Sequence, residues 1–393
     1  MNILLLSYYF PPDLSAGSFR SKALADAIAS FGEKVKLDVI TTSPNRYRSF
    51  QPESIEDSDA NYRITRIALP RRAQGMKGQV LDFIRFARSA RKAAPEPHYD
   101  LVVATSSRLM TACLGTWLAR GYGAALYLDM RDIFVETFED VFASKLASSV
   151  GWVFGRLERW VLRTANTVNL VSPGFLPYFK QRCDRNDYRF FTNGVDDEFV
   201  RVSKTLEERL PFERFGAPLN IVYAGNIGDG QGLDNILPEL SCRLAGKANF
   251  TVIGDGGTCE VLRQKCLELG APVELVAPVP REELLEYYLK ADILFLHLND
   301  IPAFQRVLPS KLFEYAALGR PILAGVRGYA SEFVEEWIEG VKVFPPGDVE
   351  AAVKAFESLS LKTYHRHEFV ERFARSYIMQ SMARDVIQTG AAH

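Results

Sequence analysis

The sequence lacks both a long apolar run and any cluster of cysteine or histidine residues. No stretch of about 18 apolar residues occurs among its 393 residues, so we expect no membrane-spanning segment. The opening apolar run, Ile3–Leu6, is too short for a signal peptide and follows no basic start. The five cysteines form no CxxC pair, which predicts reduced cytoplasmic thiols. Because the five histidines are equally scattered, we expect no metal site.

Net charge is also nearly absent. A value of −1 at pH 7 disfavours nucleic acid as a partner of the whole molecule. Hydrophobic residues make up 47% of the chain and charged residues 24%, which are ordinary proportions for a globular protein. At roughly 100–200 residues per domain, the length predicts two domains.

Short apolar runs alternate with helical patterns along most of the chain, which predicts a doubly wound parallel sheet in each half. The expected strands of the first half are Ile3–Ser7, Val35–Thr41, Leu101–Thr105, Ala125–Asp129 and Thr167–Ser172. Those of the second half are Asn220–Ala224, Phe250–Ile253, Val273–Val276, Ile293–Leu296, Pro321–Ala324 and Val341–Phe344. A polar connector, 201–218, separates the two series. We expect Rossmann-like domains at 1–203 and 204–366, and a helix in 367–393 for which packing on the first domain is one option.

Glycine-rich loops follow the first two expected strands of the second half. Gly225–Gly232 contains four glycines in eight residues, and 254–257 contains three more. Such loops let a phosphate-bearing ligand approach the backbone. They do not form GxGxxG, which disfavours a nicotinamide dinucleotide. In the first half, the loop before the helix at Phe19–Phe31 holds Gly17, where Arg20 is placed to add positive charge for a phosphate.

The stretch 309–318 predicts a helix whose first turn binds a diphosphate. Pro309 suits the first helical position, so the amide groups of Ser310 and Lys311 lie among the unpaired donors of that turn. Lys311 adds a positive charge beside them. Glu314, three residues later on nearly the same face, has a carboxylate suited to two vicinal hydroxyls. An ordinary amphipathic helix with a surface lysine–glutamate pair would show the same pattern.

These motifs resemble the signature of the family 4 retaining glycosyltransferases, which adopt the two-domain GT-B fold with the domains facing across a cleft. The matching segments of the second half are Gly225–Gly232, Val252–Gly256, Ala291–Ile293, Pro309–Tyr315 and Gly319–Pro321. Those of the first half are Tyr9–Pro12, Asp129–Asp132 and Thr192–Asp196. The likeness is greatest with the bacterial O-antigen and capsule branch, which includes fucosamine transferases.

The resemblance implies a role for each matching residue. Lys311 contacts the diphosphate, Glu314 holds the ribose, and the backbone of 277–280 reads the nucleobase. Asn226 and Gln231 stand where the family has arginine and lysine. Arg306 stands in place of the first glutamate of the motif. The residues expected at the donor are Gly17, Asn226, Gln231, Gly254, Ala277, Val279, Arg306, Ser310, Lys311 and Glu314.

For catalysis, we expect Arg131, Asp132 and Lys311 to take part, because Asp129–Asp132 ends a buried strand and Lys311 faces the leaving group. Asp132 is placed to orient a hydroxyl, although an arginine–aspartate structural pair explains the segment equally well. No general base is assigned. Front-face attack, assisted by the departing diphosphate, needs positioning and charge neutralisation above all. The nucleotide sugar is a co-substrate, and no cofactor is expected.

The segment 71–92 predicts a basic amphipathic helix that lies on anionic lipid. Seven basic residues and one acid give it a local charge of +6. The residues expected at the membrane are Arg71, Arg72, Lys77, Arg85, Arg88, Arg91 and Lys92. For the second aromatic and basic stretch, Trp152–Arg163, we favour a half-buried core helix. The chain is then expected on the inner face of the cytoplasmic membrane.

The expected activity is transfer of a hexose or amino sugar from a nucleoside diphosphate sugar, with UDP favoured over GDP. The expected acceptor is a lipid-linked glycan of a bacterial surface polysaccharide. Two alternatives remain. A nucleotide-sugar epimerase of the same fold would not need the basic helix, and an inactive partner subunit would explain the missing arginine, lysine and glutamate of the family motifs.

Overall fold

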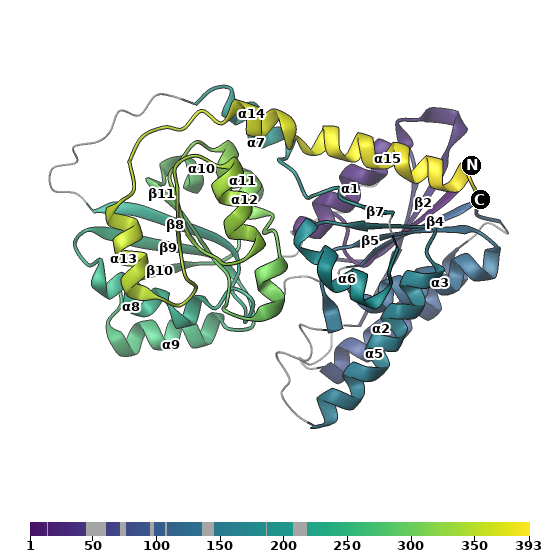
Figure 1. Cartoon of the computed structure of the whole chain (residues 1–393), viewed down its shortest axis with the longest axis horizontal. Coiled ribbons are helices and arrows are strands. Elements are labelled where there is room, and N and C mark those ends of the chain that lie inside the picture. Colours follow the sequence, from purple (N-terminus) through teal and green to yellow (C-terminus); the bar gives the residue numbers. More distant parts are fainter. Residues whose placement is uncertain are drawn as a thin grey trace. The chain divides into compact units, whose positions relative to one another are not determined.

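The computed structural model describes residues 1–13, 15–44, 60–70, 76–94, 98–106, 108–135, 145–185, 187–206 and 218–393 (Figure 1). The chain divides into two compact units. The first contains Met1–Asn193 and Arg375–His393, and the second contains Gly194–Ala374. The domain bounds expected from the sequence differ from these units at two places. Helices α7 (Asp197–Ser203) and α14 (His367–Arg372) both belong to the second unit.

Parallel strands form the sheet of the first unit, in the order β3-β2-β1-β4-β5-β6-β7. Their bounds are β1 (Asn2–Ser7), β2 (Lys36–Thr42), β3 (Arg63–Ile67), β4 (Leu101–Ser106), β5 (Ala125–Met130), β6 (Thr167–Leu170) and β7 (Tyr188–Arg189). Strands β4 and β5 are buried along their whole length, which explains their continuous apolar pattern. The edge strand β3 is half-exposed and was not predicted.

Helices cover both faces of this sheet. Those of the first unit are α1 (Ala16–Ala29), α2 (Met76–Ala93), α3 (Leu109–Tyr122), α5 (Lys145–Thr164), α6 (Leu176–Arg182) and α15 (Arg375–Ala391). Helix α3 contacts both α2 and α5 on one face, and α15 packs against α1 on the other (Figure 1). The last helical pattern, expected as one helix at 367–388, is therefore broken into α14 and α15, which pack on different units.

The second unit repeats the architecture, with parallel strands in the order β10-β9-β8-β11-β12-β13. The strands are β8 (Leu219–Asn226), β9 (Ala248–Asp255), β10 (Val273–Val276), β11 (Ile293–His297), β12 (Ile322–Gly325) and β13 (Val341–Phe344). Its helices also include α8 (Leu237–Arg243), α9 (Cys259–Leu269), α10 (Arg281–Lys290), α11 (Lys311–Ala317), α12 (Tyr329–Trp337) and α13 (Val349–Glu357). Each strand of this unit was predicted to within two residues at either end.

A buried ion pair holds α1 to the sheet of the first unit. Arg20 is 0% exposed, and its Nε and Nη2 atoms donate to the two carboxylate oxygens of Asp129, each at 2.9 Å. The same guanidinium donates to the carbonyl oxygens of Phe191 and Thr192. Burial opposes ionisation of Asp129, but Arg20 outweighs it and lowers the pKa of the carboxyl. The expectation that Arg20 binds a phosphate is wrong, because its guanidinium is fully buried and is hydrogen-bonded to groups of the protein itself.

We predict that Asp129→Ala lowers the free energy of unfolding by about 3–5 kcal/mol, because it leaves the Arg20 guanidinium buried without its counter-ion. Urea unfolding, followed by the fluorescence and circular dichroism of the purified variant, measures the loss. The matched control is Lys22→Ala, which breaks an exposed pair with Asp26 on the same helix. It should cost less than about 0.5 kcal/mol. Equal stability of the two variants would contradict the prediction.

Candidate functional site

Each sheet has one point where the strand order reverses, and ligands of such folds bind beyond the carboxyl ends of the strands there. In the second unit the reversal lies between β8 and β11, and in the first unit between β1 and β4. The loops at these points contain the glycines and charged residues singled out by the sequence.

The glycine loops after β8 and β9 pack directly on each other. Gly225 has φ 142° and Gly254 has φ 152°, a backbone conformation that residues with side chains rarely adopt. A Cβ on Gly254 would collide with the carbonyl oxygen of Gly225, and one on Gly256 would collide with that of Ile227. The glycines at 254 and 256 therefore meet a packing requirement as well as leaving backbone open to a ligand.

Lys311 fills the space beside the first of these loops. Its ammonium lies against Gly225, where a side chain at that position would otherwise sit, and 5.6 Å from the ring centroid of Tyr223. Burial lowers the pKa of Lys311, and the nearby Glu314 carboxylate opposes that shift. Within the described residues, no carboxylate forms a direct ion pair with Lys311. A half-buried lysine ammonium thus lies at the switch point of the second sheet.

Helix α11 begins at Lys311, two residues later than predicted. Ser310 is the residue before it, and the amide of Leu312 donates to the carbonyl oxygen of Pro309 at 3.2 Å in a tight turn. Pro309 thus belongs to the turn that leads into the helix. The amides of Ser310 and Lys311 precede this first turn bond, as the sequence indicated.

Asn226 and Gln231, expected at the donor, are hydrogen-bonded to each other. The Asn226 Nδ2 donates to the Gln231 Oε1 at 2.7 Å, and the Tyr223 hydroxyl donates to the Asn226 carbonyl oxygen at 2.6 Å. The two amide side chains close the loop after β8 on itself. Their first role is therefore to fix the shape of the loop against which Lys311 lies.

The remaining donor-site residues of this unit lie on α11 and on two other loops. Glu314 is half-buried, one turn after Lys311. Burial would lower the pKa of Arg281, but the charges of Asp196 and, to a smaller extent, Glu314 raise it. Arg306 is half-buried at the end of the short 3-10 turn Pro302–Arg306. In the loop between β10 and α10, Ala277 is exposed while Val279 packs against the core of the unit.

Sequence reasoning missed His297, at the end of β11. This side chain is 1% exposed, and its Nδ1 lies 2.6 Å from the carbonyl oxygen of Gln231. The amide of Gly347 donates to its Nε2 at 3.0 Å, so the proton is on Nδ1 and the ring is neutral. Burial lowers its pKa. A lone histidine ending an apolar strand was the one available signal.

In the first unit, the structure brings Gly17 and Arg131 together. The Arg131 guanidinium packs on the Cα of Gly17, in the first turn of α1. The Ser15 hydroxyl caps this turn by accepting from the amide of Ser18 at 3.2 Å. Burial lowers the pKa of Arg131, and the charges of Asp129 and Asp132 oppose the shift. Asp132 itself is exposed. The structural arginine–aspartate pair here is the one made by Arg20 and Asp129.

Of the residues expected at a membrane, four are described with their side chains. Arg85 lies 3.9 Å from Asp82, while Arg88, Arg91 and Lys92 are exposed on α2. Lys77 lies in α2 with its side chain outside the described part, and Arg71 and Arg72 fall outside the described residues. Among the described residues, no helix is long and apolar enough to cross a membrane. The same residues contain no group of three or more potential metal ligands.

We predict that His297→Gln flattens the pH dependence of stability. The folded-state pKa lies below the ordinary 6.5, so the stability due to His297 is complete above that pH and is lost as pH falls through the folded pKa. The melting temperature of the wild type should therefore fall more steeply between about pH 7.5 and pH 5 than that of the variant. The exposed His98, replaced by glutamine, is the control and should leave the slope unchanged. Parallel curves for wild type and His297→Gln would refute this role.

Comparison with known proteins agrees with this architecture. A family described as glycosyl transferase 4-like domain matches residues 19–194, and one described as glycosyl transferases group 1 matches residues 218–361. A curated relative, the colanic acid biosynthesis glycosyl transferase named WcaI of Escherichia coli strain K12, is 30% identical over 159 residues. That alignment spans 39% of this chain and 39% of the relative.

Solved structures share the fold over the full length. The structure of HepE from Anabaena in complex with UDP has a TM-score of 0.64 at 16% identity, and covers 99% of this chain and 100% of its own. The lipopolysaccharide outer core galactosyltransferase WaaB has a TM-score of 0.61 at 15% identity, with 99% of each chain covered. The chain thus carries a glycosyl transferase 4-like domain followed by a glycosyl transferases group 1 domain, on the two-domain fold that these solved glycosyltransferases share.

Proposed function

We propose that the protein transfers a hexose or amino sugar, with retention of configuration, from a nucleoside diphosphate sugar to a lipid-linked glycan acceptor. UDP is the favoured nucleotide, and the pathway is the synthesis of a bacterial surface polysaccharide. The branch that includes the fucosamine transferases is the one we favour within the family. The proposed reaction uses no metal ion and no cofactor.

The observation that carries the proposal is the position of Lys311. Its side chain is half-buried, and burial lowers its pKa. Its ammonium lies on the backbone of Gly225 and has no direct ion pair with a carboxylate within the described part of the chain. Burying a positive charge without a counter-ion costs free energy, and a bound anion would offset that cost. The first-turn amides of α11 add further donors at the same place. A diphosphate satisfies all of these groups at once.

Glu314 supplies the second half of donor recognition. One turn beyond Lys311, its carboxylate is placed to accept hydrogen bonds from the two hydroxyls of a ribose. The nucleotide is proposed as UDP because the Anabaena HepE structure of the same fold was solved in complex with UDP. The polysaccharide pathway rests on the WcaI relative, named for colanic acid biosynthesis, and on the lipopolysaccharide galactosyltransferase of the same fold.

In the proposed reaction, an acceptor hydroxyl oxygen bonds to the anomeric carbon while the bond from that carbon to the diphosphate oxygen breaks. The hydroxyl proton passes to the departing phosphate, so no separate base is needed. Lys311 neutralises the negative charge that grows on the leaving group. Arg131, packed on Gly17 at the start of α1, offers a second positive charge in the first unit. Asp132 is proposed to orient a hydroxyl.

The lipid-linked acceptor places the protein on the inner face of the cytoplasmic membrane, as a peripheral protein. Support comes from α2, whose exposed side carries Arg85, Arg88, Arg91 and Lys92. Each cation near an anionic bilayer contributes on the order of 1 kcal/mol to the free energy of membrane binding. An epimerase would gain nothing from such a helix, which is why we favour a transferase.

We predict that Lys311→Met weakens binding of UDP about 10- to 150-fold, since a hydrogen bond to a charged group contributes about 1.5–3 kcal/mol. Uridine, which has no phosphate, should bind wild type and variant alike. Isothermal titration calorimetry measures both. Lys290→Met, on the exposed side of α10 in the same unit, is the control and should not change either affinity.

A companion variant separates the two halves of the site. Glu314→Gln should weaken uridine and UDP by the same factor, because the lost hydrogen bonds are to the ribose. If Lys311→Met lowered uridine and UDP affinity equally, the lysine would act on the fold of the site and the diphosphate assignment would be lost. Wild-type protein that binds UDP but neither hydrolyses nor transfers from any UDP-sugar would favour the inactive-subunit alternative.

We predict that the triple variant Arg85→Ala, Arg88→Ala, Arg91→Ala binds vesicles containing phosphatidylglycerol on the order of 100-fold more weakly than the wild type. Co-sedimentation over a series of lipid concentrations gives the affinity. The control removes three cations from the second unit, at Arg243, Lys247 and Lys290, and should bind as the wild type does. Equal loss in both triple variants would mean that net charge alone, with no specific surface, governs membrane binding.

A further inference from the structure

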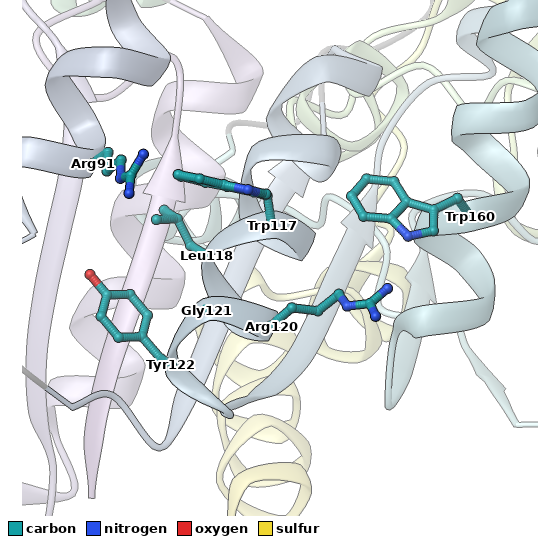
Figure 2. A pocket seen from close by; sticks show the side chains of 7 residues that line it. All are labelled: Arg91, Trp117, Leu118, Arg120, Gly121, Tyr122 and Trp160. Atoms are coloured by element: carbon teal, nitrogen blue, oxygen red, sulfur yellow. The ribbon is translucent and has the colours of Figure 1, made fainter.

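A groove in the first unit lies where the carboxyl-terminal halves of α2, α3 and α5 come together (Figure 2). Its volume is about 610 Å³. The residues that line it are Arg91, Trp117, Leu118, Arg120, Gly121, Tyr122 and Trp160. The groove belongs to neither of the two switch points, because α3 leaves the carboxyl edge of the sheet at its start and reaches the opposite edge at Tyr122.

The lining combines flat aromatic rings with cations. The Arg91 guanidinium stacks over the Trp117 ring at 4.6 Å, and Trp117 itself is 45% exposed. Figure 2 shows the Tyr122 hydroxyl directed toward Arg91, and Arg120 reaching toward the ring of Trp160. The side chains of Arg91 and Arg120 form no ion pair with any described carboxylate. Arginine fits a phosphate through its planar fork of donors, and indole rings favour the interfacial region of a bilayer.

Two exposed stripes flank this groove, and each changes from apolar to basic along its helix. On α2, Leu81 and Ile84 are 45% and 40% exposed, and the stripe continues through Arg88 and Arg91 at helical spacing. On α5, Trp152 and Val153 are 59% and 48% exposed, and the stripe continues through Arg156, Arg159 and Arg163. The other face of α5 is buried, so 152–163 is the half-buried helix that the sequence predicts, and its exposed face carries this stripe.

Most of the described cations on these three helices have no acidic partner. Arg88, Arg91, Lys92, Arg120, Arg156, Arg159 and Arg163 make no ion pair in the described part of the chain. Arg85 of α2, by contrast, lies 3.9 Å from Asp82. A surface with many cations and few acids beside exposed apolar side chains matches an anionic bilayer in both charge and polarity.

We propose that the groove binds the phosphate headgroup of an anionic phospholipid, at the centre of a membrane-contacting surface formed by α2, α3 and α5. Arg91 and Arg120 hold the phosphate, while Trp117 and Trp160 lie at the level of the headgroups. The apolar starts of the α2 and α5 stripes enter the outer part of the hydrocarbon. The proposal rests on the membrane placement given above and adds a specific site and two further helices to it.

The lining also argues against a neutral glycan as the occupant. Sugar hydroxyls are usually bound by carboxylates and amides in addition to aromatic rings, and the groove has neither of these groups among its lining residues. The apolar parts of the two stripes lie nearer the carboxyl edge of the sheet than the groove does, because helices between parallel strands run opposite to the strands. The part of the surface that enters lipid is thus nearest to the edge where ligands bind, which suits a lipid-linked acceptor.

The test is vesicle binding by the full chain carrying Arg120→Glu and, separately, Trp117→Ala. Both side chains are exposed, so the fold should persist, and a thermal melt checks it. With vesicles of phosphatidylglycerol in phosphatidylcholine, each variant should lose at least about tenfold in affinity. The control is Tyr377→Ala with Arg384→Glu on α15, which covers the other face of the sheet and should bind as the wild type does.

The outcomes separate this proposal from the membrane placement itself. If the groove variants bind vesicles like the wild type while the α2 triple variant does not, the headgroup site is wrong and the membrane contact of α2 stands. If the wild type fails to bind vesicles at all, both proposals fail. If soluble glycerol phosphate or a soluble glycan protects the groove in a thermal melt while vesicles do not, the occupant is not a bilayer lipid and the proposal is overturned.

Discussion

One interaction organises the candidate donor site, namely the contact of the Lys311 ammonium with the bare backbone of Gly225. It requires glycine at 225, because any side chain there would occupy the space of the ammonium. It also places a cation at the point where strand order reverses, with the first turn of α11 beside it. The lysine is half-buried, burial lowers its pKa, and it has no direct carboxylate partner in the described part of the chain, so an anionic ligand would stabilise its charge.

Hydrogen bonds within the second unit fix the loop that Lys311 contacts. Asn226 and Gln231 close the loop after β8, and His297 fastens the far end of that loop to β11 and to the amide of Gly347. All three are neutral hydrogen bonds, and the two made by His297 join elements that are distant in sequence. The unit thus combines an uncharged network that fixes the loop with one lysine that supplies positive charge beside it.

The sequence predicted the sheets well and the contacts between distant side chains poorly. Strands such as β10 and β13 were placed residue for residue because buried parallel strands are short, apolar and bounded by turns. The edge strand β3 was missed because Arg63 and Arg66 interrupt its apolar pattern. Arg20 was misjudged because its partner, Asp129, lies 109 residues away. The sequence also could not predict that Trp152 is exposed, because an aromatic residue at helical spacing is found on buried and exposed faces alike.

The most direct test of the account is a crystal structure of the protein with UDP bound. We predict a β-phosphate oxygen within about 2.7–3.0 Å of the Lys311 Nζ and the ribose hydroxyls on the Glu314 carboxylate. A nucleotide bound elsewhere, or a Lys311 ammonium paired with a carboxylate of the protein while UDP is present, would contradict it.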